Sequence, residues 1–245
     1  MSSRFGITIT KTFKNLVMLS YGNLLTKPIL NDISKVYKVP IFNINDYIFQ
    51  LISSKEKSKT INYLRECVKF KKKIEDWAIF TIIQRRLSQE EEAKGIIFDS
   101  FPKKLSQILI LNTILERKIV LKLDVDPSIL TEILSGRREC PKCRKEYFIN
   151  NINKGDFLFN SSLPKEDIKK CDKCNILLIH QEKDKLESVQ KQIEKTKNLL
   201  MPLFQYYQKN IRMIERQITK ENEKCEFIKN DLDNFFTNEI ESKNK

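Results

Sequence analysis

The chain has 245 residues, 40% of them hydrophobic, and 45 Lys and Arg against 32 Asp and Glu, for a formal net charge of +13. This length fits one ordinary domain with inserts, and the apolar fraction excludes disorder over most of it. No apolar run approaches the ~20 residues that a membrane span needs. The charge favours an anionic partner, such as a nucleotide, RNA or an acidic protein surface. A scattered lysine surface that only confers solubility is the alternative.

The first residues, 1–14, contain no acidic residue and are predicted to form an N-terminal extension. An organellar transit peptide has the same composition. If these residues are an ordinary extension, we expect a cytoplasmic protein. A transit peptide would imply the alternative, a mitochondrial location.

Predicted elements begin with an apolar run over 16–19, which indicates a buried strand, followed by helical spacing over 30–36. A second strand is predicted over 39–42, and a helical stretch opens at 47–51. A basic connector covers 69–73 and leads into an amphipathic helix over 74–87. Gly95 ends that segment before a third strand over 96–99.

The second half continues the alternation, with a helix over 106–115, a fourth strand over 119–125 and a helix over 129–134. After a cysteine-bearing insert, a long helix is predicted over 184–209, bent or divided at Pro202. A strand over 211–214 and a helix over 222–236 precede a flexible tail, 237–245. The pattern predicts an α/β fold whose parallel sheet binds ligands beyond the carboxyl ends of its strands.

Two C-x-x-C knuckles, Cys140-Pro-Lys-Cys143 and Cys171-Asp-Lys-Cys174, lie on either side of residues 144–170. Two such knuckles that face each other make a tetrahedral zinc site. Because thiolates fill all four positions, the ion should fold the insert rather than catalyse a reaction. Disulfides or redox thiols are the alternative, and they require an oxidising compartment.

The segment from Gly136 through both knuckles, and the helix that follows it, resemble the zinc-bearing lid and C-terminal half of adenylate kinases. Upstream, Asp99-Ser-Phe-Pro-Lys103 with Gln107 is similar to the family's D-G-F-P-R-x-x-x-Q. The resemblance covers roughly 15–236. It implies a five-stranded parallel sheet of the P-loop nucleoside monophosphate kinase type, an AMP-binding insert over 43–74 and a mobile, zinc-ribbon-like lid over 137–176.

The phosphate loop that the family implies, G-x-x-x-x-G-K-[ST], should follow the first strand. The chain has only 5 glycines, about 2% against a usual ~7%, and one of them, Gly22, stands in this segment. Leu25 aligns with the second motif glycine and Thr26 with the lysine, while Lys27 comes one residue late. Pro28 lacks the N–H that a phosphate cradle would use.

The lid positions are similarly altered, since the family's two lid arginines fall at Gln181 and Gln192. The arginine that would pack on the ATP adenine aligns with Ile133. Arg137 stands at the family's phosphate-contacting position, with Lys183 and Lys185 as nearby substitutes that lack the guanidinium fork.

The AMP side keeps more of the family's residues. The positions that the resemblance assigns to nucleotide binding are Asp46, Ile74, Asp99, Lys103 and Gln107. Lys103 replaces an arginine, which keeps the charge but loses bidentate geometry. Ser100 replaces a glycine, and Phe49 replaces the second AMP-phosphate arginine.

Together these residues predict an adenylate kinase-like protein, catalytically impaired, that still binds a nucleoside monophosphate, with AMP favoured over ATP. One alternative is an active ATP:AMP or GTP:AMP phosphotransferase with a rebuilt phosphate loop that uses Lys27, Arg137 and Lys183 or Lys185. Another is a structural subunit whose basic surface docks on RNA or an acidic protein. We expect one structural zinc ion, and Mg²⁺ only if ATP binds.

Overall fold

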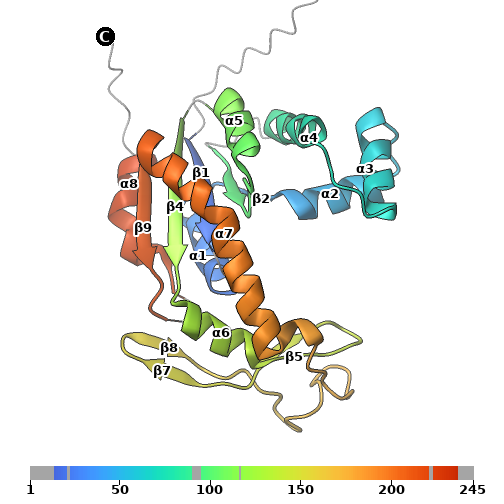
Figure 1. Cartoon of the computed structure of the whole chain (residues 1–245), viewed down its shortest axis with the longest axis vertical. Coiled ribbons are helices and arrows are strands. Elements are labelled where there is room, and N and C mark those ends of the chain that lie inside the picture. The colour runs from blue at the N-terminus through green and yellow to red at the C-terminus, as the bar shows by residue number, and fades with distance from the viewer. Residues whose placement is uncertain (1–13, 21–22, 90–94, 116, 221–222, 237–245) are drawn as a thin grey trace, which may run out of the picture.

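The computed structural model describes residues 14–20, 23–89, 95–115, 117–220 and 223–236 (Figure 1). Its main sheet has five parallel strands, in the order β2-β3-β1-β4-β9. The strands are β1 (Lys14–Ser20), β2 (Ile41–Asn43), β3 (Ile97–Asp99), β4 (Arg117–Asp124) and β9 (Met213–Gln217). The predicted α/β fold with a five-stranded parallel sheet is therefore confirmed.

Strand β1 is central, and its pairing explains the unbroken apolar run from Leu16 to Leu19. Leu16 pairs with both Ile97 of β3 and Ile119 of β4. Leu16 and Met18 belong to the hydrophobic cluster on one face of the sheet, while Val17 and Leu19 belong to the other. Both faces of this run are covered, so it lacks the alternation of polar and apolar residues that a half-exposed strand shows.

Helices cover both faces of this sheet (Figure 1). In the described part of the chain they are α1 (Asn23–Tyr37), α2 (Ile44–Ser53), α3 (Lys59–Lys69), α4 (Asp76–Gln89), α5 (Leu105–Ile114), α6 (Pro127–Ser135), α7 (Leu186–Asn210) and α8 (Lys229–Phe236). One hydrophobic cluster joins α1, α6 and α8, and the other joins α2 to α5. The long helix α7 contributes to both.

The segment between β2 and β3 forms an arm of three helices that extends away from the sheet (Figure 1). The helix predicted from residue 74 begins at Asp76, because Ile74 still belongs to the connector after α3. The bounds of the insert over 43–74 stay a prediction.

The second insert lies between α6 and α7 and contains two small antiparallel sheets. One pairs β5 (Arg137–Glu139) with β6 (Glu146–Phe148), and the other pairs β7 (Ile152–Lys154) with β8 (Phe157–Phe159). Gly136 ends α6, as predicted. We call residues 137–176 the lid, and that boundary stays a prediction.

Three predictions near the C-terminus are corrected. Pro202 does not divide α7, which is one helix of 25 residues, because the buried side chains of Leu200, Leu203 and Phe204 anchor the helix on either side of it. The last strand is 213–217 rather than 211–214, and the helix predicted from 222 begins with a 3₁₀ turn, Cys225–Ile228.

Several predictions fall outside the described residues: Gly22, the tail 237–245 and all but the last residue of the extension 1–14. They stay predictions. No helix in the described part of the chain is both long enough and apolar enough to cross a membrane.

Candidate functional site

A cavity of about 510 Å³ opens at the carboxyl ends of β1, β2 and β3, where the sheet predicts a ligand site. Ser20, Asn43 and Asp99 contribute from the strand ends, Lys103 from the following loop and Arg137 from the lid. Lys183, Gln192 and Thr196 complete the side toward α7. Sheet, lid and α7 thus surround one space that is lined by both charged and neutral polar groups.

Asp99 is held at the floor of this cavity by two neighbours. Asn43 Nδ2 donates to Asp99 Oδ2 over 2.9 Å, and Ser100 Oγ donates to Asp99 Oδ1 over 3.0 Å. Ser100 has φ of +58°, a left-handed conformation that glycine adopts most readily. The resemblance places a glycine at this position, so the backbone has the shape that a glycine would favour although the residue has changed.

Asn43 was not singled out in the sequence, yet it connects two elements of the site. Its side chain caps α2 by accepting from the N–H groups of Asn45 and Asp46 at 3.0 and 3.3 Å. The same side chain donates to Asp99. An asparagine directly before an apolar-periodic segment is a helix N-cap signal that could have identified it.

Lys27 lies apart from Arg137. It lines a second cavity of about 340 Å³ with Asp46 and Arg86, and this cavity shares Asn43 and Asp99 with the first. Arg137 lines the first cavity and Lys27 does not, so the two predicted catalytic residues face different spaces.

Of the predicted nucleotide-binding residues, Asp99 and Lys103 line the main cavity, and Asp46 lines the second. Gln107 is nearly buried, and its Oε1 accepts the Lys103 N–H over 2.8 Å, so it holds the start of α5. Ile74 is half-buried against the core. Neither Gln107 nor Ile74 is among the residues that line these two cavities.

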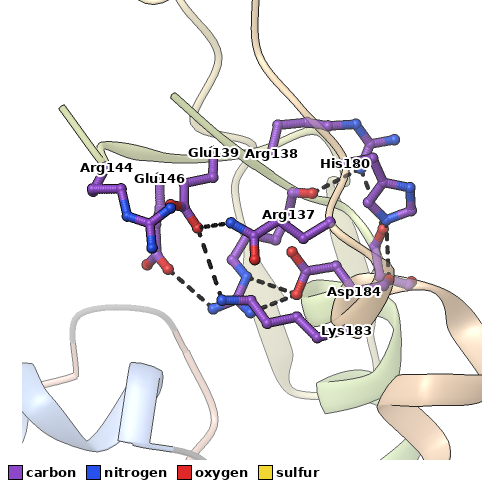
Figure 2. Close-up of polar contacts among 10 residues, drawn as sticks. Arg137, Arg138, Glu139, Arg144, Glu146, His180, Lys183 and Asp184 are labelled. Carbon is purple, nitrogen blue, oxygen red and sulfur yellow. Dashed lines mark hydrogen bonds and ion pairs between the residues drawn. The ribbon is translucent and has the colours of Figure 1, made fainter. Parts of the chain in front are cut away.

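Arg137 forms an ion pair at the cavity with Asp184, which is fully buried (Figure 2). Its Nε and Nη2 lie 3.0 and 2.5 Å from Asp184 Oδ1, and its Nη1 lies 3.0 Å from Glu146 Oε1. Burial alone lowers the pKa of Arg137, but the hydrogen bond and charge of Asp184, with those of Glu146, raise it above its ordinary value. The guanidinium is therefore charged and already has two carboxylate partners.

A second network surrounds Glu139, which is also buried (Figure 2). Gln181 Nε2 donates to Glu139 Oε2 over 2.5 Å. Arg144 Nη1 lies 2.7 Å from Oε1 and Lys183 Nζ lies 3.8 Å from Oε2. Together with the Arg137 group, three basic and three acidic side chains cancel in formal charge. The acids Glu139 and Asp184 were missed because the motif comparison considered only the basic positions of the lid.

The four knuckle cysteines come together in the lid. Their Sγ atoms all lie within 4.8 Å of one another, and Cys143 Sγ is 3.5 Å from Cys171 Sγ. Tetrahedral zinc with Zn–S bonds of ~2.3 Å requires S···S separations of about 3.8 Å, so the cluster fits the ion. All four are free thiols rather than disulfides.

Tyr147, buried beside the cluster, supports it from β6. Its hydroxyl lies 3.5 Å from Cys171 Sγ and accepts the Asp172 N–H over 3.0 Å. This hydroxyl contact is the main cause that lowers the pKa of Cys171 to about 6. Thiolate is the form that binds zinc, so the contact with the Tyr147 hydroxyl favours the ligand form of Cys171.

The parallel sheet, the cavity at its carboxyl edge and the cysteine-bearing lid define the class, a P-loop-kinase-like α/β protein. No protein-family model matches the chain. It is 28% identical to the adenylate kinase of Treponema denticola over 178 residues, 73% of this chain and 79% of that protein. It is 27% identical to the adenylate kinase of Thermotoga neapolitana over 198 residues, 78% of this chain and 84% of that protein.

A third relative, the adenylate kinase of Thermoanaerobacter sp. (strain X514), is 34% identical over 138 residues, which are 54% of this chain and 58% of that protein. With these matches and this fold, the chain is similar to adenylate kinases over about three quarters of its length.

Proposed function

We propose that this adenylate kinase-like protein binds a nucleoside monophosphate in the main cavity and transfers phosphoryl groups very slowly. The main observation in support of slow transfer is that α1 starts at Asn23, only three residues after β1 ends at Ser20. Leu25 is 2% and Thr26 1% exposed, and Leu25 belongs to the core cluster. From Lys27 onward, helix geometry directs each available backbone N–H to a carbonyl four residues earlier. This segment therefore offers a helix terminus rather than a loop that surrounds a triphosphate.

The charge arrangement of the lid supports the same proposal. Phosphoryl transfer needs positive charge directed at the transferring group. Arg137 is paired with Asp184 and Glu146, and Lys183 lies near Glu139, so these two cationic groups at the cavity already have carboxylate partners. Removing one transition-state contact typically costs about 10²–10³ in rate. With the loop lysine and two lid arginines absent, and with incomplete additivity, a loss of roughly 10⁴–10⁶ is expected, about 5–8 kcal/mol of barrier.

Monophosphate binding is supported by the polar groups on the strand side of the cavity. Asn43, Asn45, Ser100 and Lys103 line it there, and among the described residues Lys103 has no ion-pair partner. One ammonium group suits a monophosphate better than a triphosphate, and Mg²⁺ has little to bridge without the latter. The relatives are adenylate kinases, which favours AMP as the nucleotide.

Calorimetric titration of AMP and ATP separately tests the binding half of the proposal. AMP should bind and ATP should not. Lys103→Ala should weaken AMP binding at least tenfold, because Lys103 is the one cation without an ion-pair partner among the described residues that line the main cavity. Lys209→Ala, at the far end of α7, should leave AMP binding unchanged. Failure of AMP to bind would overturn the proposal.

An active phosphotransferase with a rebuilt loop is the alternative function, and it requires Lys27 to act with Arg137. ADP formation from ATP plus AMP at high protein concentration separates the two. Turnover of about 1 s⁻¹ or more, the low end of typical enzymes, that is lost in Lys27→Ala would favour the active enzyme. If neither nucleotide binds and RNA binds in a salt-dependent way, the structural-subunit alternative gains.

We also propose that the four-cysteine cluster holds one structural zinc ion. Cys140, Cys143, Cys171 and Cys174 would supply four thiolates, which leaves no open position for substrate or water. The ion's contribution would be to fold the lid, in line with the burial of Cys140, Cys171 and Tyr147 as a small separate cluster.

A further inference from the structure

We propose that the hairpin β7–β8 fastens the lid to the core, so that the lid is a fixed wall of the cavity rather than a mobile cover. This hairpin, residues 150–160, is called the clasp below; it lies beneath α6 and extends toward the end of β9 (Figure 1). The inference concerns the motion of the lid and does not depend on nucleotide binding.

The clasp has one apolar face, and that face is buried in the main core. Ile152, Phe157 and Phe159 are at most 5% exposed and belong to the same hydrophobic cluster as α1, α6 and α8. Leu158, between the two phenylalanines, is 46% exposed. The alternation is that of a strand with one side on a core, and here the core is that of the sheet and not that of the zinc knuckles, which form their own cluster.

The apolar face of the clasp meets the first turns of α1. Phe148 and Phe159 pack edge to face at 5.7 Å, and together with Leu24, Leu25 and Pro28 they line a small cavity of about 260 Å³. The helical segment that replaces a phosphate loop thus lies against the lid. Motion of the lid would expose these aromatic rings to water, which opposes it.

A backbone contact joins the clasp to the strand end on the opposite side. The Leu158 N–H donates to the Thr219 carbonyl over 3.0 Å, and Leu158 forms a parallel bridge with Lys220. Strand β8 therefore pairs with the segment that follows the end of β9. This hydrogen bond joins residues that are far apart in the sequence, so it forms only while the clasp is packed against the core.

The base of the clasp is attached to α6. Asn150 Nδ2 donates to the Glu132 carbonyl over 2.6 Å, and Lys154 pairs with the Glu132 carboxylate. A Cβ at Gly136 would lie 2.7 Å from side-chain atoms of Asn150, so this close approach requires glycine. The clasp thus contacts α1, α6 and the segment after β9, and a lid rotation about residues 136 and 176 would break all three attachments at once.

Amide hydrogen exchange of the zinc-loaded, nucleotide-free protein tests this inference. Amides of residues 150–160 should exchange at least 100-fold more slowly than in a free peptide, with Leu158 among the slowest. Phe159→Ala should accelerate their exchange at least tenfold and leave the knuckle peptides 140–147 and 171–176 unchanged. The matched control is Leu158→Ala, on the exposed face of the same strand, which should stay within twofold of the natural protein.

Unprotected clasp amides in the natural protein would overturn the inference, as would equal effects of the two variants. Should Phe159→Ala fail to fold, Asn150→Ala, which removes only the contact to the Glu132 carbonyl, should still accelerate exchange over 150–154 at least threefold; no acceleration would count against the clasp. Repeating the exchange with AMP and an ATP analogue should leave clasp protection within twofold, and nucleotide-dependent opening would contradict a fixed lid. Absence of nucleotide binding, by contrast, would contradict only the proposed function.

Discussion

Arg137 and Asp184 form a buried ion pair in which two guanidinium nitrogens meet a single carboxylate oxygen, Oδ1, at 3.0 and 2.5 Å. The pair connects the first strand of the lid with the segment that leads into α7. It also places the charge of Arg137 at the cavity while compensating it. A group that the family resemblance assigns to phosphate contact is thereby part of the structural support of the lid.

Asp184→Asn should destabilise the protein by about 2–4 kcal/mol, because a partly buried guanidinium would lose its main partner. Urea denaturation measures the change. Glu146→Gln is the matched control, since Glu146 contacts the same guanidinium from an exposed position and should cost at most about 1 kcal/mol. Equal effects of the two substitutions would show that the buried pair is not the dominant contact.

Leu25→Gly introduces the residue that a phosphate loop would have at this position, and it should cost about 3–5 kcal/mol. The substitution removes a 2% exposed side chain from the core and places glycine in a helix. Lys27→Ala, two residues later and exposed, should change the free energy of unfolding by no more than about 0.5 kcal/mol. A loss below about 1 kcal/mol in Leu25→Gly, accompanied by new ATP binding, would contradict the assignment of this segment to the core.

Metal analysis should find about one equivalent of zinc per chain. Cys171→Ser should lose it, because one of four thiolates is removed, and circular dichroism and proteolysis should then show an unfolded lid. His180→Ala is the control, since this histidine is close in sequence but hydrogen-bonds the Asp184 carbonyl through Nε2 at 3.0 Å and should leave the metal content unchanged. A zinc-free protein with an ordered lid would refute the structural role.

Asp32 links α1 to the C-terminal segment and should produce a measurable pH dependence. Its carboxylate accepts the Cys225 N–H over 2.9 Å, and this hydrogen bond holds the pKa of Asp32 below its ordinary value. Because the folded-state pKa is the lower one, the stabilisation is complete above the unfolded pKa of ~3.9 and is lost as pH falls through the folded value.

Asp32→Asn should therefore cost about 1 kcal/mol at pH 7, a value reduced for solvent screening, and the difference from the natural protein should shrink as pH falls through the folded-state pKa of Asp32. Denaturant melts of both proteins at several pH values measure this difference. The difference between the free energies of unfolding of the two proteins cancels the acid sensitivity of the zinc site, because both proteins contain that site. A difference that is constant with pH would contradict the assigned linkage.

Local sequence was sufficient wherever short-range physics governs the structure. The apolar runs at Leu16 and Ile119 specify buried strands, Gly136 ends a helix, and the spacing of Cys140 and Cys143 predicts that their thiols lie close together. In each case the signal and the structure lie within a few residues, so no distant contact is needed to interpret it. The start of α1 could not be predicted in this way. Leu25 and Thr26 are helical and buried because they pack against other elements of the core, and those contacts cannot be seen in the local sequence.

The sequence by itself determined the α/β class, the parallel sheet, the cysteine cluster and the edge at which the cavity opens. Only the tertiary structure decided that Lys27 and Arg137 face different cavities, that Asp184 pairs with Arg137 and Glu139 with Arg144, and that Phe159 packs into the main core. These are relations between side chains far apart in the chain, which are set by the direction of each helix and strand and by which apolar faces meet. Hydrophobic periodicity identifies the apolar face of each helix or strand. Which of these faces pack against each other is decided only when the whole core forms.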